Sequence, residues 1–298
     1  MLRYNTQPQH ADQLPETGPG HSPQRRRILM AGLGVGFALA ANPVMAQVIH
    51  TPADGLDTGE VKILTSDGDI PGYRAMPASG GPFPTIVVIE EVFGVHEHIK
   101  DICRRLARLG YYVIAPELFA REGNPLDADI ETILKDIVPK VPDAQAMSDL
   151  DAAVAFAKAS GKADTGRLGT IGFCWGGRMV WLFAEHDPKL KAAVAFYGIL
   201  GGAASPTTSI KAVNPIEFGA KVTVPVLGLY GGQDSNIPGD LIARMRTELK
   251  QGGHGGEIVV YPDAPHGFFA DYRPSYRPEA ARDAWAKALA WFKDHGVA

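Results

Sequence analysis

From Val61 onward, short runs of β-branched and aliphatic residues alternate with longer stretches in which apolar residues recur at helical spacing. This alternation predicts a mostly parallel sheet covered by helices, which is the α/β class. The short runs are apolar on both faces, as buried parallel strands must be. Strands are expected at 85–90 (TIVVIE), 112–115 (YVIA), 168–173 (LGTIGF), 192–196 (AAVAF), 224–230 (VPVLGLY) and 258–261 (IVVY).

Helical periods fall between these runs, with glycine or proline at their borders. Two segments, 123–141 and 198–222, are harder to assign, and the second is expected to form a long loop or a partial cap. In a doubly wound sheet, functional residues gather at the carboxyl ends of the strands. Helices are expected at 98–109, 143–160, 176–185, 239–251 and 278–294.

Length and charge narrow the possible functions. The 298 residues are 45% hydrophobic, which is enough to bury one sizeable core. Lysine and arginine number 29 against 33 aspartate and glutamate, so the net charge is only −4. Because no basic stripe is present to bind a phosphate backbone, nucleic acid is not an expected partner.

The first 46 residues are predicted to be a signal peptide of the twin-arginine type. A polar stretch leads to Arg25-Arg26-Arg27, an apolar run follows over 28–41, and Val44-Met45-Ala46 offers the small residues that a signal peptidase accepts. Cleavage after Ala46 would leave 47–298 as a single domain. The alternative is a membrane anchor, but an apolar run of about 14 residues falls short of the roughly 20 that cross a bilayer. We therefore expect export to the periplasm by the twin-arginine machinery, with no stable membrane anchor after cleavage.

Two cysteines in an exported protein first suggest a disulfide. Cys103 lies in a stretch whose apolar residues have helical spacing, and it is interpreted as a small residue near a helix face. Cys174 stands instead between a strand and a helix, where a free thiol has a chemical use. We therefore expect the two cysteines not to be bonded to each other.

Cys174 is the candidate nucleophile. The segment 172–177 (GFCWGG) directly follows a predicted strand and precedes a predicted helix, which is the pattern of a nucleophile elbow with cysteine in place of serine. The strained turn requires Gly172 and Gly176 to lack side chains, and the helix N-terminus favours a thiolate and a developing oxyanion. The alternative is a glycine-rich turn that binds phosphate and contains an incidental cysteine.

Two further residues complete a candidate triad. Asp234 follows the strand at 224–230, and His266 follows the strand at 258–261, so the chain order is nucleophile, aspartate, histidine. His266 would act as the general base, and Asp234 would hold its imidazole in the required tautomer. Asp263 and Asp240 compete for the orienting role, but neither directly follows a buried strand within a glycine-rich turn.

From about Gly59 to its C-terminus, the chain resembles the dienelactone hydrolase family, the carboxymethylenebutenolidases. The resemblance implies an α/β-hydrolase fold, a Cys-His-Asp triad, no cofactor and no metal. It also implies that Glu91 lies beside the nucleophile thiol and helps to control its ionisation. The motifs that carry it are 90–95 (EEVFGV), 116–121 (PELFAR), the elbow around Cys174, 232–234 (GQD) and 266–268 (HGF).

Glu91 can also be interpreted without the family. A carboxylate at a strand end in a partly buried cleft can accept a thiol proton, although it could equally be a surface charge or the partner of an arginine such as Arg121. The backbone N–H groups of Val92 and Trp175 are expected to form the oxyanion hole. The Trp175 side chain could also form a wall of the substrate pocket or serve only in packing.

The expected substrate is a small ester or lactone. Arg121 and Arg273, together with Trp175, are candidate substrate-binding residues. The better-studied family pattern has an arginine shortly after the catalytic histidine, and here the position four residues after His266 is Ala270. This departure makes a charged dienelactone a less certain substrate.

The predicted reaction is hydrolysis of a carboxylic ester or lactone through an acyl-thioester. An alternative of another class is a non-catalytic member of the same fold that binds a small molecule. A redox-active thiol is a third possibility, but it would need a resolving cysteine, and Cys103 is interpreted as structural.

Overall fold

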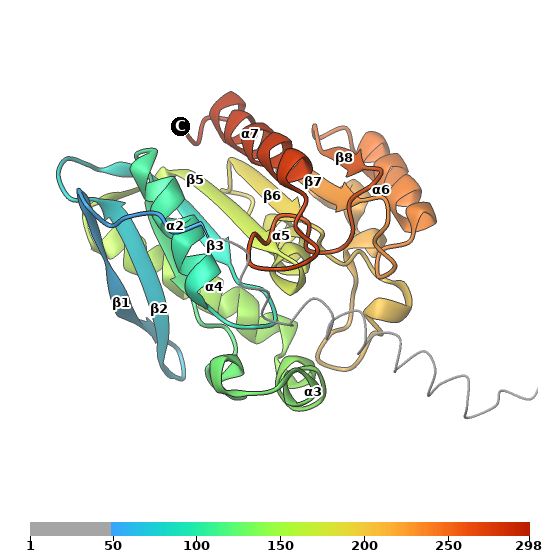
Figure 1. Cartoon of the computed structure of the whole chain (residues 1–298), viewed down its shortest axis with the longest axis horizontal. Coiled ribbons are helices and arrows are strands. Elements are labelled where there is room, and N and C mark those ends of the chain that lie inside the picture. Colours follow the sequence, from blue (N-terminus) through green and yellow to red (C-terminus); the bar gives the residue numbers. More distant parts are fainter. Residues whose placement is uncertain (1–48) are drawn as a thin grey trace, which may run out of the picture.

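The computed structural model describes residues 49–298 (Figure 1). The predicted signal peptide, 1–46, lies outside the described residues. Within them, no helix combines the length and the apolar character that a membrane crossing requires.

One eight-stranded sheet forms the centre of the molecule, in the order β1-β2-β4-β3-β5-β6-β7-β8. β1 and β2 form an antiparallel hairpin that pairs with β4, and every other neighbouring pair is parallel. The predicted class and the mostly parallel sheet are confirmed, whereas the hairpin was not predicted. The strands are β1 (Leu56–Thr65), β2 (Gly68–Pro77), β3 (Phe83–Ile89), β4 (Tyr112–Pro116), β5 (Ala163–Phe173), β6 (Ala192–Phe196), β7 (Val226–Gly231) and β8 (Glu257–Tyr261).

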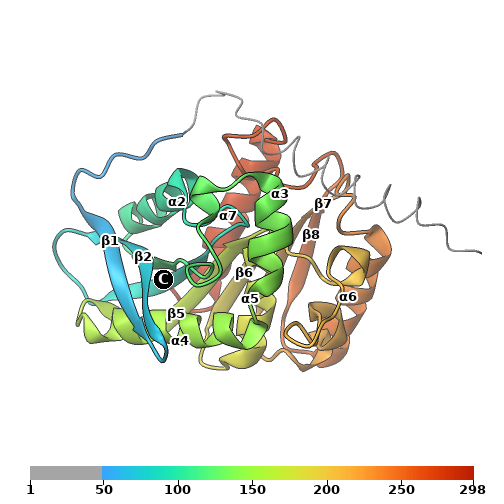
Figure 2. The ribbon, with the colours of Figure 1, turned by 90° about the horizontal axis from the view of Figure 1, so that it is seen from below.

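Helices cover both faces of the sheet (Figure 2). α2 and α7 lie on one face, and α4 and α5 lie on the other. Each starts and ends within about one residue of the predicted bounds, because its apolar period and its flanking turn residues agree. The long helices are α2 (Glu97–Arg108), α4 (Asp143–Ala159), α5 (Trp175–His186), α6 (Gly239–Gly252) and α7 (Pro278–Asp294).

The two segments that resisted assignment contain only short helical turns. The first lies between β4 and α4, and the second between β6 and β7. They meet where Lys211 Nζ donates to the backbone carbonyl of Val138 over 2.7 Å. The turns are η1 (Pro125–Asp127), α3 (Ile130–Thr132), η2 (Ile133–Ile137), η3 (Val138–Lys140), η4 (Gly202–Ala204), η5 (Pro215–Glu217) and η6 (Gly219–Lys221).

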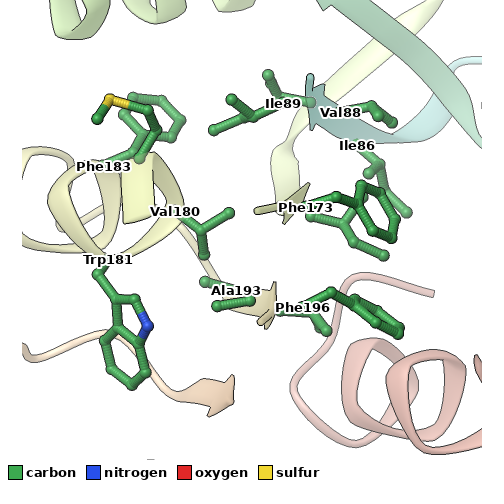
Figure 3. Packing of buried hydrophobic residues seen from close by; sticks show 14 of the residues in the cluster. Ile86, Val88, Ile89, Phe173, Val180, Trp181, Phe183, Ala193 and Phe196 are labelled. Carbon is green, nitrogen blue, oxygen red and sulfur yellow. The ribbon is translucent and has the colours of Figure 1, made fainter. Parts of the chain in front are cut away.

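Aromatic packing fixes the ends of the central strands beneath the candidate residues. Phe173 and Phe196, the last residues of β5 and β6, have ring centroids 4.9 Å apart, and Phe269 stacks on Phe173 at 5.5 Å. Figure 3 shows Phe173 and Phe196 on one side of the strands and Val180 of α5 on the other. Burial of each phenylalanine side chain contributes about 2 kcal/mol to the stability of the fold, because apolar surface is removed from water. The carboxyl ends of β5 and β6 therefore form a rigid base for the candidate site.

Candidate active site

Cys174 occupies a strained turn between β5 and α5. Its φ of 57° and ψ of −114° lie in a region that side chains rarely adopt. A Cβ on Gly172 would come within 2.4 Å of the Gly176 carbonyl oxygen, so a glycine is required there. The Cys174 backbone N–H donates to the Phe196 carbonyl at 3.0 Å, which ties the turn to the neighbouring strand. The thiol is thus held at the carboxyl end of β5 at the start of a helix, as the elbow pattern predicts.

The elbow also packs tightly against the end of β3. A Cβ on Gly176 would lie 2.4 Å from the carbonyl oxygen of Ile89 and 2.3 Å from that of Glu90. The first turn of α5 therefore abuts the loop that carries Glu91 and Val92. The first N–H groups of a helix have no partner within the helix, and Trp175 is the first residue of α5. This contact brings together the two segments expected to supply the oxyanion hole.

His266 and Asp234 lie together beside the thiol. His266 Nδ1 is 2.7 Å from Asp234 Oδ2. Burial disfavours the charged imidazolium, but the charge of Asp234, the charge of Cys174 and hydrogen bonds to both outweigh it and hold the pKa of His266 well above its ordinary value. Asp263 and Asp240 are exposed, so neither takes the place of Asp234 beside the imidazole. The arrangement can hold a thiolate next to an imidazolium.

Glu91 is completely buried and lies in a cluster of polar side chains. Its Oε2 accepts hydrogen bonds from Tyr272 Oη at 2.8 Å and Arg273 Nη2 at 3.1 Å, and His96 Nε2 lies 3.2 Å away. Burial works to raise the pKa of Glu91, but the charge of Arg273 and the interactions with His96 lower it below its usual range. Glu91 is therefore an ionised carboxylate whose arginine partner is Arg273 and not Arg121.

Arg273 is buried at the centre of this cluster. Its guanidinium carbon lies 4.6 Å from the centre of the Phe93 ring, a cation–π contact, in addition to the ion pair with Glu91. Its Nε and Nη1 have no hydrogen-bond partner among the described residues. Burial opposes the charged form of Arg273, but the charge of Glu91 and smaller contributions that include Cys174 hold the pKa of Arg273 above its ordinary value, so the guanidinium and the sulfur are close enough to interact. A cation with unpaired donors thus lies near the candidate nucleophile.

Two other sequence candidates have different surroundings. Arg121 pairs with Asp149 at 2.7 Å and also binds Asp67 and Thr65, so its donors link β1–β2 to α4. The Trp175 ring packs on Phe119, with ring centroids 4.5 Å apart. The structure therefore brings Arg273 into the cluster around Glu91 and leaves Arg121 in an ion-pair network of its own.

Sequence reasoning missed three residues of the site: His96, Tyr272 and Tyr197. Tyr197 follows β6 with a φ of 39°, and its ring centroid lies 5.0 Å from that of His266. Its position directly after a buried strand was a usable signal. Tyr272 is 181 residues from Glu91 in the chain and meets it only in the fold. His96 lies five residues after Glu91, in the loop between β3 and α2, and its contact with Glu91 depends on how that loop turns.

Both cysteines are free and buried. Burial raises the pKa of the Cys103 thiol, so this cysteine remains protonated and inert. No group of three or more histidine, cysteine, aspartate or glutamate side chains within 49–298 is arranged to hold a metal ion.

The fold and the site together define an α/β-hydrolase. The sequence profile of the dienelactone hydrolase family matches residues 70–296, and the chain belongs to this family. It is therefore a hydrolase that acts on ester or lactone bonds.

Relatives cover nearly the whole chain. A provisionally named carboxymethylenebutenolidase of Methylorubrum extorquens is 57% identical over 276 residues, which are 92% of this chain and 94% of that protein. A protein of the same provisional name from Escherichia coli K12 is 49% identical, over 88% of this chain and 96% of its own length. The crystal structure of a provisionally named dienelactone hydrolase from Klebsiella pneumoniae superimposes with a TM-score of 0.77 at 48% identity, covering 80% of this chain and 98% of that one.

Proposed function

We propose that the chain hydrolyses small carboxylic esters or lactones with Cys174 as nucleophile, His266 as general base and Asp234 as the residue that orients it. The observation that carries this proposal is the strained turn at Cys174 beside the His266–Asp234 pair, joined at 2.7 Å. The imidazole beside the buried thiol holds its proton more firmly than an ordinary histidine, which suits the acid–base partner of a nucleophile.

The reaction would proceed in two halves. The Cys174 thiolate attacks the ester carbonyl, and the backbone N–H groups of Val92 and Trp175 bind the resulting oxyanion. His266 then gives its proton to the departing oxygen, which leaves an acyl-thioester on Cys174. In the second half His266 takes a proton from water, the hydroxide attacks the thioester, and the acid is released as the thiolate re-forms.

The surroundings of Arg273 favour a substrate that carries a carboxylate close to its ester or lactone group. Its guanidinium is buried, and two of its nitrogen atoms lack partners among the described residues. An arginine fork binds a carboxylate well in such a place. The carboxymethylenebutenolidase name of the relatives denotes a lactone of this kind. In this proposal Glu91 holds Arg273 in place, and the family resemblance assigns it a further role in controlling the ionisation of the thiol.

The test compares the mature chain from Gln47 with its Cys174→Ala variant on p-nitrophenyl acetate and on dienelactone. Cys103→Ala is the matched control, since it removes the other buried thiol. We expect the first variant to lose hydrolysis of both substrates and the control to retain it. Equal rates in wild type and Cys174→Ala would overturn the thiol mechanism and favour the alternative, a family member that only binds a small molecule.

Dienelactone tests the role of Arg273 separately. Arg273→Met should raise KM for dienelactone and leave KM for the uncharged p-nitrophenyl acetate nearly unchanged. Equal increases for both esters would contradict carboxylate binding by this arginine without affecting the proposal for Cys174.

A further inference from the structure

Two glutamates that the proposed reaction does not use contact the loops that follow β3 and β4, the first of which carries Val92. Glu90 follows the last residue of β3, and Glu117 follows the last residue of β4, the parallel neighbour of β3. Glu90 is completely buried, and Glu117 is half-buried. Carboxylates are rarely found in such positions without a cation.

Each carboxyl group binds the loop that belongs to the other strand. The Leu118 N–H, after β4, donates to Glu90 Oε1 at 2.7 Å, and the Val95 N–H, after β3, donates to Glu117 Oε2 at 3.2 Å. Glu117 Oε2 also lies 3.2 Å from where a Cβ on Gly94 would be, so it packs against this loop. The two glutamates thus form a reciprocal clamp between loops 90–95 and 116–120.

One oxygen of this pair has no hydrogen-bond donor within 49–298, although the backbone N–H groups of Leu118 and Phe119 both interact with Glu90. Glu90 Oε2 is buried and has no donor among the described residues. The side chains of Glu90 and Glu117 are within hydrogen-bonding reach of each other. The charged groups of neighbouring elements are Lys100 of α2 and Glu60 of β1, which neutralise each other in an ion pair at 2.8 Å.

The electrostatics of the two groups agree with this geometry. Burial and the charge of Glu117 raise the pKa of Glu90 well above its ordinary value. Burial also raises the pKa of Glu117, although the hydrogen bond from Val95 and the contact with Glu90 oppose this effect. Two like charges within hydrogen-bonding reach of each other, one of them completely buried, favour retention of one proton by the pair.

We propose that Glu90 and Glu117 share a single proton and that the resulting carboxyl–carboxylate hydrogen bond positions the loop whose Val92 amide binds the oxyanion. The two are positioning residues that never touch substrate, and this role rests on the proposed function of Val92. Loss of the shared proton at alkaline pH leaves two facing carboxylates, whose repulsion loosens the clamp. The rate of acylation then falls while the nucleophile remains intact.

The shared proton is tested without substrate. Infrared spectra of the full mature chain at neutral pH should contain the carbonyl stretch of a protonated carboxylic acid, and Glu90→Gln and Glu117→Gln should each lack it. Glu185→Gln, at the exposed end of α5, is the matched control and should retain it. No such band in the wild type, or an equal band in both pair variants, would overturn the proposal. Because this measurement needs no turnover, failure of the proposed hydrolysis would not affect it.

The positioning role is tested by the pH dependence of kcat. An amide at position 90 is a permanent donor to Glu117, so Glu90→Gln should keep its kcat at alkaline pH values where the wild type loses several-fold, with KM changed little in either. Glu90→Ala removes the hydrogen bond and should lose kcat at every pH. If Glu90→Gln folds poorly, Glu117→Gln provides the same comparison. The same alkaline fall in wild type and in a folded glutamine variant would refute the positioning role.

Discussion

The charge state of His266 depends on residues from three different strand ends. Asp234 comes from the loop after β7, His266 from the loop after β8 and Cys174 from the turn after β5. The Asp234 carboxylate both fixes the tautomer of the ring and stabilises its protonated form. Removal of the Asp234 carboxylate should therefore lower the rate of hydrolysis far more than the stability of the fold.

Asp234→Asn should lower kcat for p-nitrophenyl acetate by about 10⁴-fold, because an amide favours the wrong tautomer of His266. The matched control is Asp263→Asn, which changes an exposed aspartate three residues before His266 and should have little effect. Steady-state kinetics measure both. A loss of less than tenfold in Asp234→Asn would contradict the assigned role.

The buried pair of Glu91 and Arg273 should matter for stability. Glu91→Gln leaves the guanidinium without its counter-charge, and we expect it to lower the free energy of unfolding by about 3 to 5 kcal/mol. Urea denaturation measures this change. Glu97→Gln, which removes an exposed partner of Arg104, should cost less than about 1 kcal/mol.

The ion pair between Glu91 and Arg273 also predicts how the difference in unfolding free energy between wild type and Glu91→Gln varies with pH. The folded state lowers the pKa of Glu91 below its ordinary value of 4.5. Its stabilisation is therefore complete above pH 4.5 and is lost as the pH falls toward the folded value. The gap between wild type and Glu91→Gln should shrink below pH 4.5, and a gap that widens there would contradict the ion pair.

The candidate triad could be predicted from sequence because its members come soon after strands, whereas most of the contacts around Glu91 could not. Cys174, Asp234 and His266 each come after a recognisable apolar run, and the structure brings all three together. His96 lies only five residues after Glu91, but no sequence signal indicated that the intervening loop turns its ring back toward the carboxylate. Tyr272 reaches Glu91 only through tertiary folding, since 181 residues separate the two in the chain. Arg273 was a candidate for substrate binding, but its pairing with Glu91 depends on the same distant contact.

At the scale of elements, the most demanding contact is between the first turn of α5 and the end of β3. Gly176→Ala would place a methyl group 2.3 Å from the Glu90 carbonyl oxygen. Because the backbone must move to accommodate the methyl group, we expect a loss of about 1 to 3 kcal/mol in unfolding free energy and a lower kcat.

Gly239→Ala is the matched control for that substitution. Gly239 begins α6, and a Cβ there would meet nothing within 4 Å. Its unfolding free energy should stay within about 0.5 kcal/mol of the wild type. Similar losses in the two variants would show that the contact between α5 and β3 is not tight.

Helices were predictable from the helical spacing of their apolar residues, and buried parallel strands from short, continuous apolar runs bounded by turn residues. The β1–β2 hairpin was missed because charged residues and Gly59, Gly68 and Gly72 interrupt its apolar residues, although β2 buries several of them. The first part of β5 was missed for a similar reason, since the residues from Ala163 to Arg167 (ADTGR) include no large apolar side chain and are partly exposed.

At the scale of the whole molecule, we propose that the chain is exported by the twin-arginine pathway. Replacing Arg25, Arg26 and Arg27 by lysine keeps the charge but removes the guanidinium geometry, so the variant should remain in the cytoplasm. Immunoblots of periplasmic and cytoplasmic fractions measure this. Arg282→Lys, on an exposed turn of α7, is the control, and unchanged export of the triple variant would contradict the pathway.

The ion pair between Glu91 and Arg273 joins residues 182 positions apart. Contacts this distant in sequence form late, because a long stretch of chain must be ordered before they can close. A ribosome must therefore synthesise almost the entire polypeptide before this pair can assemble around the thiol. Under the proposed mechanism, a prematurely terminated chain would lack both His266 and Arg273 and should not hydrolyse esters.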